Sequence, residues 1–200
     1  MRSGVEIRSR DTSQAVERFL LFPTAFGTCG IAWRDGGLTR LQLPEHDVSA
    51  TERRLALRAS AAQPGKEPPW VQWAIVALQR YFVGRAIDFN GVLVDLDRSS
   101  PFHQRIYAAL REIAWGKTIT YGALAAEVGA PDAARAIGQA MGRNPVPIII
   151  PCHRVLASGG RIGGFSAPGG ATTKQRLLEL EGVRRTNTPP LLALLEQGRT

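Results

Sequence analysis

Short apolar runs separated by turn residues fill the first part of the chain, in a pattern typical of β-strands. The stretch over 18–45 alternates in this way, and Asp35-Gly36-Gly37 is a favourable hairpin connection. Helical spacing of apolar residues follows over 49–60 and again over 70–82, and 86–97 has the composition of a strand or extended segment. The pattern predicts a small α/β domain built on an antiparallel sheet.

The pattern becomes helical from Ser100 onward. Ser100 followed by proline is a helix-start signal, and a helix is expected over 101–114, closing near Gly116. Further on, Thr120 is placed to cap a helix over 121–128 that Gly129 ends, and Pro131 begins a second helix over 132–141. Two short helices joined by a tight, glycine-containing turn form a helix-turn-helix.

These elements predict an α/β (α+β) fold in two parts. Residues 1–98 form the N-terminal α/β supporting domain, and 99–183 form a mostly helical, helix-turn-helix (winged-helix-like) domain. Residues 184–200 are a tail with room for a short helix.

The second helix of the pair has unusual side chains for a helix that reads bases. Arg135 is its long polar residue, and a backbone flanked by small residues can approach another surface closely. An arginine in such a setting is suited to a nucleic-acid groove. The alternative is a helix packed tightly on its own domain, with Arg135 in a surface ion pair. The small residues expected to point outward are Ala133, Ala134, Ala136, Gly138 and Ala140.

Charge and cysteine usage narrow the class of protein. A formal net charge of +8 favours a polyanionic partner, with nucleic acid first and a membrane surface second, although a solvated basic surface would look the same. No apolar run is long enough to cross a bilayer, the first residues have no apolar signal core, and a cytoplasmic location is expected. The two cysteines, Cys29 and Cys152, favour a reducing compartment over a disulfide framework.

Cys152 stands between Pro151 and His153 at the end of an apolar run. A thiolate is a nucleophile, and an imidazole oriented by a third group can accept the thiol proton, directly or through a water. Neighbouring side chains on a strand point to opposite faces, so these two share a site only if the chain turns, as the proline favours. The alternatives are a small buried apolar residue and a structural histidine.

The motif PCHRV over 151–155 resembles the active-site signature of the O-6-alkylguanine-DNA alkyltransferases, also called methylated-DNA–protein-cysteine methyltransferases. The segments TITYGALAAEVG, AARAIGQAMGRNPVPIIIPCHRV, GGFS and LLELEG follow the order and spacing of that family. The resemblance covers roughly 98–183; the N-terminal half matches only as the family's usual small α/β domain.

This resemblance implies a DNA repair protein that flips O-6-alkylguanine out of duplex DNA and transfers the alkyl group irreversibly to its own cysteine. It implies no cofactor, no membrane partner, a monomer, and one lesion repaired per molecule. Cys152 would attack the alkyl carbon, and His153, polarised by Glu181, would take the thiol proton through a water. Asn144 would hold the turn before the cysteine, and Tyr121 would donate to a ring nitrogen of the departing guanine.

The resemblance also implies a DNA-contact surface and a guanine pocket. Arg135 would fill the gap left by the flipped base, from a helix in the minor groove, and the backbone near Tyr121 and Gly122 would meet a phosphate. Ala134 and Ser158 match other DNA-contact positions. The implied pocket walls are Met141, Pro147, Val155, Ile162, Gly163, Phe165 and Ser166, with backbone amides near the last meeting the exocyclic oxygen.

Two departures from the family pattern bear on the substrate and on metal binding. Phe165 stands where relatives often have tyrosine, which leaves an aromatic wall but removes a phenol. Some relatives hold a structural zinc in the N-terminal domain. Here Cys29, His46 and His103 have no recognisable ligand spacing, so no metal is expected.

Three rival functions remain. The first is a non-catalytic protein that only recognises alkylated DNA, the second is a cysteine hydrolase, and the third is a DNA-binding regulator. The sequence retains a complete set of candidate reactive residues, has no separate downstream His/Asn pair for a hydrolase, and has no second helix-turn-helix in the N-terminal half.

Overall fold

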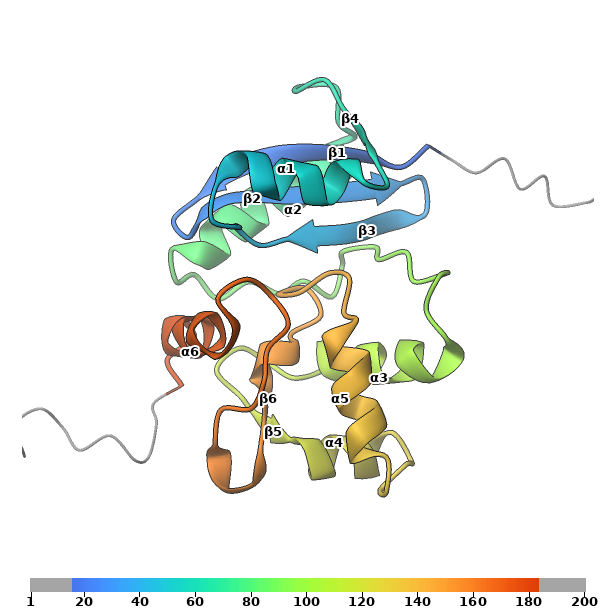
Figure 1. Cartoon of the computed structure of the whole chain (residues 1–200), viewed down its shortest axis with the longest axis vertical. Helices are drawn as coiled ribbons and strands as arrows, with labels where there is room; N and C mark the ends of the chain where they lie inside the picture. The colour runs from blue at the N-terminus through green and yellow to red at the C-terminus, as the bar shows by residue number, and fades with distance from the viewer. Residues whose placement is uncertain (1–15, 184–200) are drawn as a thin grey trace, which may run out of the picture.

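A four-stranded sheet forms one half of the molecule and a group of helices forms the other (Figure 1). The computed structural model describes residues 16–183. The sheet has the order β3-β2-β1-β4. Its antiparallel part consists of β1 (Arg18–Thr24), β2 (Gly27–Arg34) and β3 (Gly37–Gln42), while β4 (Ser60–Ala61) pairs parallel to β1.

The turn between β2 and β3 falls where the sequence predicts it. Gly37 begins β3 with φ of 137°, a backbone conformation that glycine adopts without strain. A Cβ at this position would lie only 2.8 Å from the backbone carbonyl carbon of Leu93. The close approach matters because the segment that contains Leu93, over 86–97, forms hydrogen bonds with β3 at this point.

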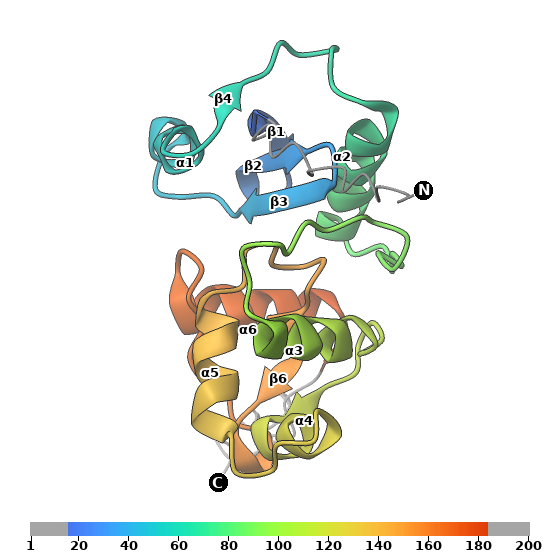
Figure 2. The ribbon, with the colours of Figure 1, turned by 90° about the vertical axis from the view of Figure 1, so that its right-hand side faces the viewer.

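Two helices cover the two faces of the sheet (Figure 2). These are α1 (Val48–Ala56) and α2 (Pro69–Phe82). Alternation along β1 sends Leu20 and Phe22 into the main core, whereas Phe19 packs in a separate cluster with Leu55 of α1. The predicted helix over 70–82 is confirmed.

One expectation for the N-terminal half is corrected, and another is decided between its two alternatives. The helix predicted over 49–60 ends at Ala56, because residues 60–61 instead form β4 and pair with β1. The segment over 86–97 is extended but forms only one isolated bridge, between Leu38 and Val94. Hydrogen bonds from Leu38 N to Leu93 O (2.9 Å) and from Asp95 N to Leu38 O (2.8 Å) fasten it to the sheet.

The helical half begins with α3 (Pro101–Arg111), β5 (Ile119–Thr120), α4 (Tyr121–Glu127) and α5 (Ala134–Gly142). The predicted caps are present: Ser100 Oγ accepts a hydrogen bond from His103 N (3.3 Å), and Thr120 Oγ1 accepts one from Ala123 N (3.2 Å). Gly129 follows α4 with φ of 71°.

Two helix bounds in this half differ from the prediction. The helix expected over 101–114 ends earlier, because tighter i→i+3 bonds from Glu112 N and Ile113 N close its last turn. The helix expected over 132–141 begins at Ala134, with no side-chain cap before it, and continues to Gly142.

The remaining elements surround the cysteine. They are the 3₁₀ turn η1 (Cys152–Arg154), β6 (Val155–Leu156), the 3₁₀ turn η2 (Ser158–Gly160) and α6 (Gly170–Leu180). β6 pairs parallel to β5 beside the α4–α5 pair. The α/β (α+β) fold class is confirmed. The tail over 184–200 lies outside the described residues.

One apolar core joins the two halves. Trp33 and Leu38 of the sheet belong to the same buried cluster as Ile106 of α3 and Ile150 before the cysteine. A backbone hydrogen bond from Leu41 N to Pro145 O (2.9 Å) adds to this contact. A domain boundary near residue 98 remains a prediction. Among the described residues, no helix combines the length and the apolar character that a membrane crossing requires.

Candidate active site

Cys152 lies at the start of η1, directly after a buried apolar run over 146–150. The chain turns here, as the prediction for a shared Cys-His site requires. Ile148 has φ of 74°, a left-handed conformation that costs a β-branched residue about 1–3 kcal/mol. Such a strained loop persists only when its surroundings hold it in place.

Asn144 supplies that restraint. Its Nδ2 donates to the carbonyl of Ile150 (2.8 Å) and to Sγ of Cys152 (3.1 Å), while its Oδ1 accepts from Val146 N (3.0 Å). One amide therefore closes the loop and contacts the sulfur. The loop-holding geometry expected of Asn144 is present, and the contact with the sulfur was not predicted.

Burial raises the pKa of the Cys152 thiol, while the hydrogen bond from Asn144 and the charge of Lys174 act to lower that pKa. The net effect favours the protonated thiol in the resting protein, so a nucleophilic role requires a base. Lys174 is itself buried, and its Nζ donates to Val155 O (2.6 Å). Sequence reasoning missed this buried cation, whose charge acts on the thiol.

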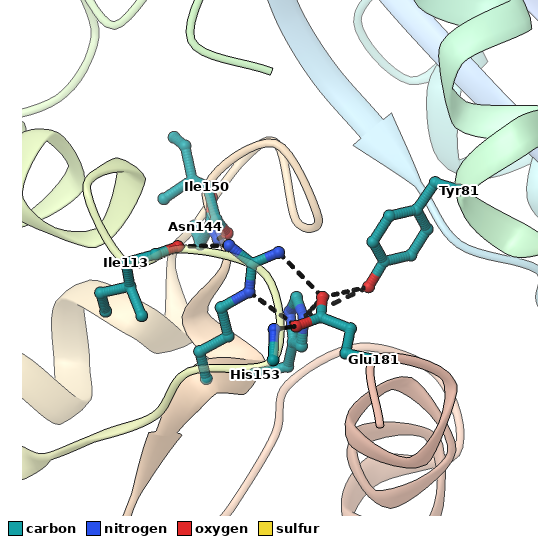
Figure 3. A network of polar contacts seen from close by, with 8 residues as sticks. Tyr81, Ile113, Asn144, Ile150, His153 and Glu181 are labelled. Atoms are coloured by element: carbon teal, nitrogen blue, oxygen red, sulfur yellow. Dashed lines mark hydrogen bonds and ion pairs between the residues drawn. The ribbon is translucent and has the colours of Figure 1, made fainter. Parts of the chain in front are cut away.

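His153 and Glu181 form a buried pair next to the cysteine (Figure 3). Nε2 of His153 lies 2.8 Å from Oε1 of Glu181, and both side chains have no exposed surface. Because an ionised carboxylate only accepts hydrogen bonds, Nε2 carries the proton. Nδ1 is then the unprotonated nitrogen, and it is a buried atom without a hydrogen-bond partner in the described part of the chain.

The electrostatics of this pair favour a neutral imidazole and an ionised carboxylate. Burial lowers the pKa of His153, against the opposing influence of Glu181. Burial alone would raise the pKa of Glu181, but hydrogen bonds from His153 and Arg154 outweigh it and lower the pKa to about 2. A neutral imidazole with a free nitrogen is chemically able to accept a proton.

Three further groups hold Glu181, and sequence reasoning missed all of them. Arg154 donates from Nε to Oε2 (2.8 Å) and from a terminal nitrogen to Oε1 (2.9 Å), and its other terminal nitrogen bonds the carbonyl of Ile113. Gly116 N donates to Oε2 (3.2 Å), and the Tyr81 hydroxyl donates to Oε1 (2.7 Å). Arg154 stands in a mostly apolar stretch of the sequence. A charge that is buried in such a stretch must be paired, and this requirement could have identified Arg154 as a site residue.

A cavity of about 300 Å³ opens beside the thiol. Four residues of the predicted pocket or catalytic set line it together with Cys152, namely Tyr121, Met141, Phe165 and Ser166. Gly138, Gly142 and Gly164 complete its wall and were not predicted. Burial raises the pKa of Tyr121, so its phenol stays protonated and able to donate a hydrogen bond.

Other predicted pocket residues lie elsewhere around the cysteine. Pro147 lines a larger cleft of about 410 Å³ that also reaches Cys152. Val155 is completely buried in β6. Ile162 and Gly163 are not among the residues lining either cavity. A Cβ at Gly163 would lie 3.3 Å from the Tyr121 ring, so its backbone supports that ring from outside.

The residues expected to contact DNA are placed on the surface of the helical half. Ala134 and Arg135 on α5, Gly122 on α4 and Ser158 on η2 are exposed. No ion pair holds Arg135 among residues 16–183, which removes the support for the alternative of a surface ion pair. One expectation is wrong: Ala140 is fully buried rather than outward. Here α5 packs against α3, and the backbone carbonyl of Ala140 accepts a hydrogen bond from the Tyr107 hydroxyl (2.8 Å).

The site therefore places a cysteine that is suited to act as a nucleophile next to a buried His-Glu pair, at the edge of a helix-turn-helix. Comparisons with known proteins agree with this class. A family model described as 6-O-methylguanine DNA methyltransferase, DNA binding domain, matches residues 101–183. A methylated-DNA–protein-cysteine methyltransferase of Mycolicibacterium paratuberculosis is 42% identical over 173 residues, covering 85% of this chain and 93% of the relative.

Solved structures are similar as well. The O6-methylguanine methyltransferase of Mycobacterium tuberculosis superposes with a TM-score of 0.67 at 33% identity, covering 90% of this chain and 99% of that one. The same organism's OGT in complex with DNA gives a TM-score of 0.66 at 34% identity, covering 82% and 92%. The chain belongs to the methylated-DNA–protein-cysteine methyltransferase family and is an enzyme of that class.

Proposed function

We propose that this protein binds duplex DNA, flips O-6-alkylguanine into the cavity beside Cys152 and transfers the alkyl group to the sulfur. The single observation that carries the proposal is the setting of Cys152: its Sγ faces the cavity and accepts the Asn144 amide at 3.1 Å, and the next residue in the same turn is His153 of the buried His153–Glu181 pair. The solved complex of a similar protein with DNA supports DNA as the partner.

The reaction is a displacement at the alkyl carbon. Sγ of Cys152 forms the new S–C bond while the O6–C bond breaks, and the guanine leaves with the electron pair of that bond. The thiol proton passes to Nδ1 of His153 through a bridging water. Glu181, held ionised by its donors, stabilises the imidazolium that results.

The leaving guanine needs stabilisation as negative charge develops on it. The protonated phenol of Tyr121 lines the cavity and would donate to a ring nitrogen, while backbone amides near Ser166 would meet the exocyclic oxygen. Phe165 would provide an apolar wall for the base. Arg135, exposed on the small-residue face of α5, would occupy the space in the duplex that the flipped base leaves.

The product is a thioether on Cys152, which offers no group that water readily displaces. Each protein molecule would therefore act only once. It would act as a monomer, because one chain contains every residue that the reaction uses. It would need no cofactor.

Transfer of a labelled methyl group from duplex DNA containing O-6-methylguanine tests the proposal. Label should reach the protein in the wild type and in Cys29→Ala, and should be absent in Cys152→Ala. Cys29 is the matched control because it is the other free thiol, is fully buried in the sheet half and lies outside the cavity. Tight binding to the lesion without labelling of the wild type would instead support a recognition protein.

A further inference from the structure

The sheet half contributes one side chain to the polar network behind the cysteine. Tyr81 lies in the last turn of α2, and its hydroxyl donates to Oε1 of Glu181 at 2.7 Å and lies 3.3 Å from Nε2 of His153 (Figure 3). The side chain has no exposed surface. Within the described residues, these two partners account for every polar contact of the hydroxyl.

The ring of Tyr81 is fixed from several sides. It packs edge-on against Phe82 and Trp115, with ring centroids 5.3 and 5.2 Å apart, and lies 6.0 Å from Phe89. A phenylalanine would satisfy this apolar packing equally well. A buried hydroxyl costs free energy unless it is bonded, so the oxygen has a reason to be there only through Glu181 and His153.

The direction of each hydrogen bond in this network follows from which of the groups can donate a proton. The hydroxyl has one proton and gives it to the carboxylate, since Nε2 of His153 already carries a proton toward the same oxygen. Tyr81 therefore cannot donate to the imidazole. Each added donor disperses the charge of Glu181, which weakens its pull on an imidazolium.

We propose that Tyr81 is a positioning residue for alkyl transfer, acting through Glu181 to keep His153 neutral with its free nitrogen at Nδ1. This inference rests on the proposed function. It assigns the sheet half a direct part in preparing the reactive site, in addition to supporting the fold. Tyr81 touches neither the sulfur nor the cavity wall, so its effect is indirect.

Several other charged groups face His153, and the test must leave them unchanged. Glu181 follows α6, Lys174 lies within α6, and Arg154 and Cys152 belong to the same turn as the histidine. Tyr81→Phe alters none of these side chains and preserves the ring packing. It removes a single oxygen atom from the network.

The matched control is Tyr107→Phe. Tyr107 is also fully buried, and its hydroxyl also makes a hydrogen bond, but to the backbone carbonyl of Ala140 (2.8 Å) and not to the His-Glu pair. Both substitutions thus remove one buried hydroxyl. Only the first changes the donors to Glu181.

The experiment measures the single-turnover rate of methyl transfer from lesion-containing duplex DNA across pH. Losing a hydrogen bond to a charged group corresponds to roughly a tenfold effect on an equilibrium, so protonation of His153 should be about tenfold more favourable in Tyr81→Phe. At pH values where protonation of His153 limits the reaction, the variant should therefore be about tenfold slower than the wild type. The pH at which the rate rises, where His153 loses its proton, should move upward by about one pH unit. Tyr107→Phe should keep the wild-type pH profile.

Nitrogen-15 NMR of the imidazoles in DNA-free protein provides a second readout. The chain has three histidines, so few signals need assignment. The proposal expects His153 as the Nε2–H tautomer in the wild type, with protonation at higher pH in Tyr81→Phe. An unchanged rate profile together with unchanged His153 titration would overturn the inference. Absence of transfer in the wild type would instead contradict the proposed function, and the NMR result would still decide the role of Tyr81.

Discussion

Glu181 Oε1 and His153 Nε2 lie 2.8 Å apart with no exposed surface on either side chain. This contact joins the residue after the last helix to the turn that contains the cysteine. Its chemistry determines both how the site accepts a proton and how the fold responds to acid, so the first prediction concerns stability.

Acid should destabilise the protein through Glu181. The pKa of this carboxyl is about 2 in the folded protein against an ordinary value of 4.5, so the stabilisation is complete above about pH 4.5 and is lost as the pH falls toward 2. The difference corresponds to about 3 kcal/mol. His153 acts in the same direction: burial lowers its pKa below the ordinary 6.5, so the unfolded chain gains protons first as the pH falls.

Urea denaturation between pH 7 and pH 3 measures this effect. Glu181→Gln should be less stable at pH 7, because Arg154 would lose its buried counter-ion, and should lose less additional stability toward pH 3. Glu179→Gln, which changes an exposed carboxylate in the last turn of α6, two positions before Glu181, is the control. If the free energy of unfolding fell by the same amount between pH 7 and pH 3 in the wild type and in Glu181→Gln, Glu181 would not be the source of the acid sensitivity.

Small thiol reagents should discriminate between the two cysteines. Cys29 is fully buried, and burial raises its pKa to about 12, whereas Cys152 faces a cavity. Iodoacetamide should therefore modify native protein once, at Cys152. Asn144→Ala should slow this modification by roughly tenfold, because the sulfur loses the amide that stabilises its thiolate. Peptide mapping after timed alkylation checks both statements, and modification of native Cys29 would disagree with them.

Arg135→Ala should impair repair of duplex DNA more than reaction with a free base. Filling the space of the flipped guanine offsets part of the unstacking free energy, which is a few kcal/mol, so a loss of roughly tenfold or more is expected on duplex DNA. Transfer from free O-6-methylguanine should be unchanged. Arg53→Ala, which removes an exposed arginine from α1 in the other half, is the matched control. Equal losses on both substrates would argue against this role.

Alkylation should destabilise the spent protein. Cys152 is only 4% exposed, and its sulfur accepts the Asn144 amide, so an added methyl group would crowd this contact even though the sulfur faces the cavity. Overpacking costs roughly 1–3 kcal/mol, or about 2–4 °C in Tm for each kcal/mol in a chain of this size. Thermal unfolding before and after reaction measures the change. Cys152→Ala incubated with the same DNA should keep its Tm.

Local signals in the sequence predicted many of the elements. The hairpin at 35–37 and the caps Ser100 and Thr120 are present because turn and cap preferences act over a few residues. The end of α1 was mistaken because β4 exists only through pairing with β1, about forty positions away. The inward position of Ala140 likewise depends on α3 packing against α5.

The candidate site was predictable only in part. The resemblance supplied Cys152, His153, Asn144 and Glu181, and the structure brings all four together. Tyr81 was not predictable, because its bond to Glu181 spans 100 positions and its helix resembles any amphipathic helix that covers a sheet. Contacts of this kind follow from the packing of the two halves and leave no local signal.

The central claim is that Cys152 accepts an alkyl group once, and the intact mass of the protein tests it most directly. After incubation with excess duplex DNA containing O-6-methylguanine, the account predicts one increase of roughly 14 Da, the mass of one CH₂, mapped to the peptide containing Cys152 and absent in Cys152→Ala. Loss of the lesion from the DNA while the protein keeps its original mass would contradict the account.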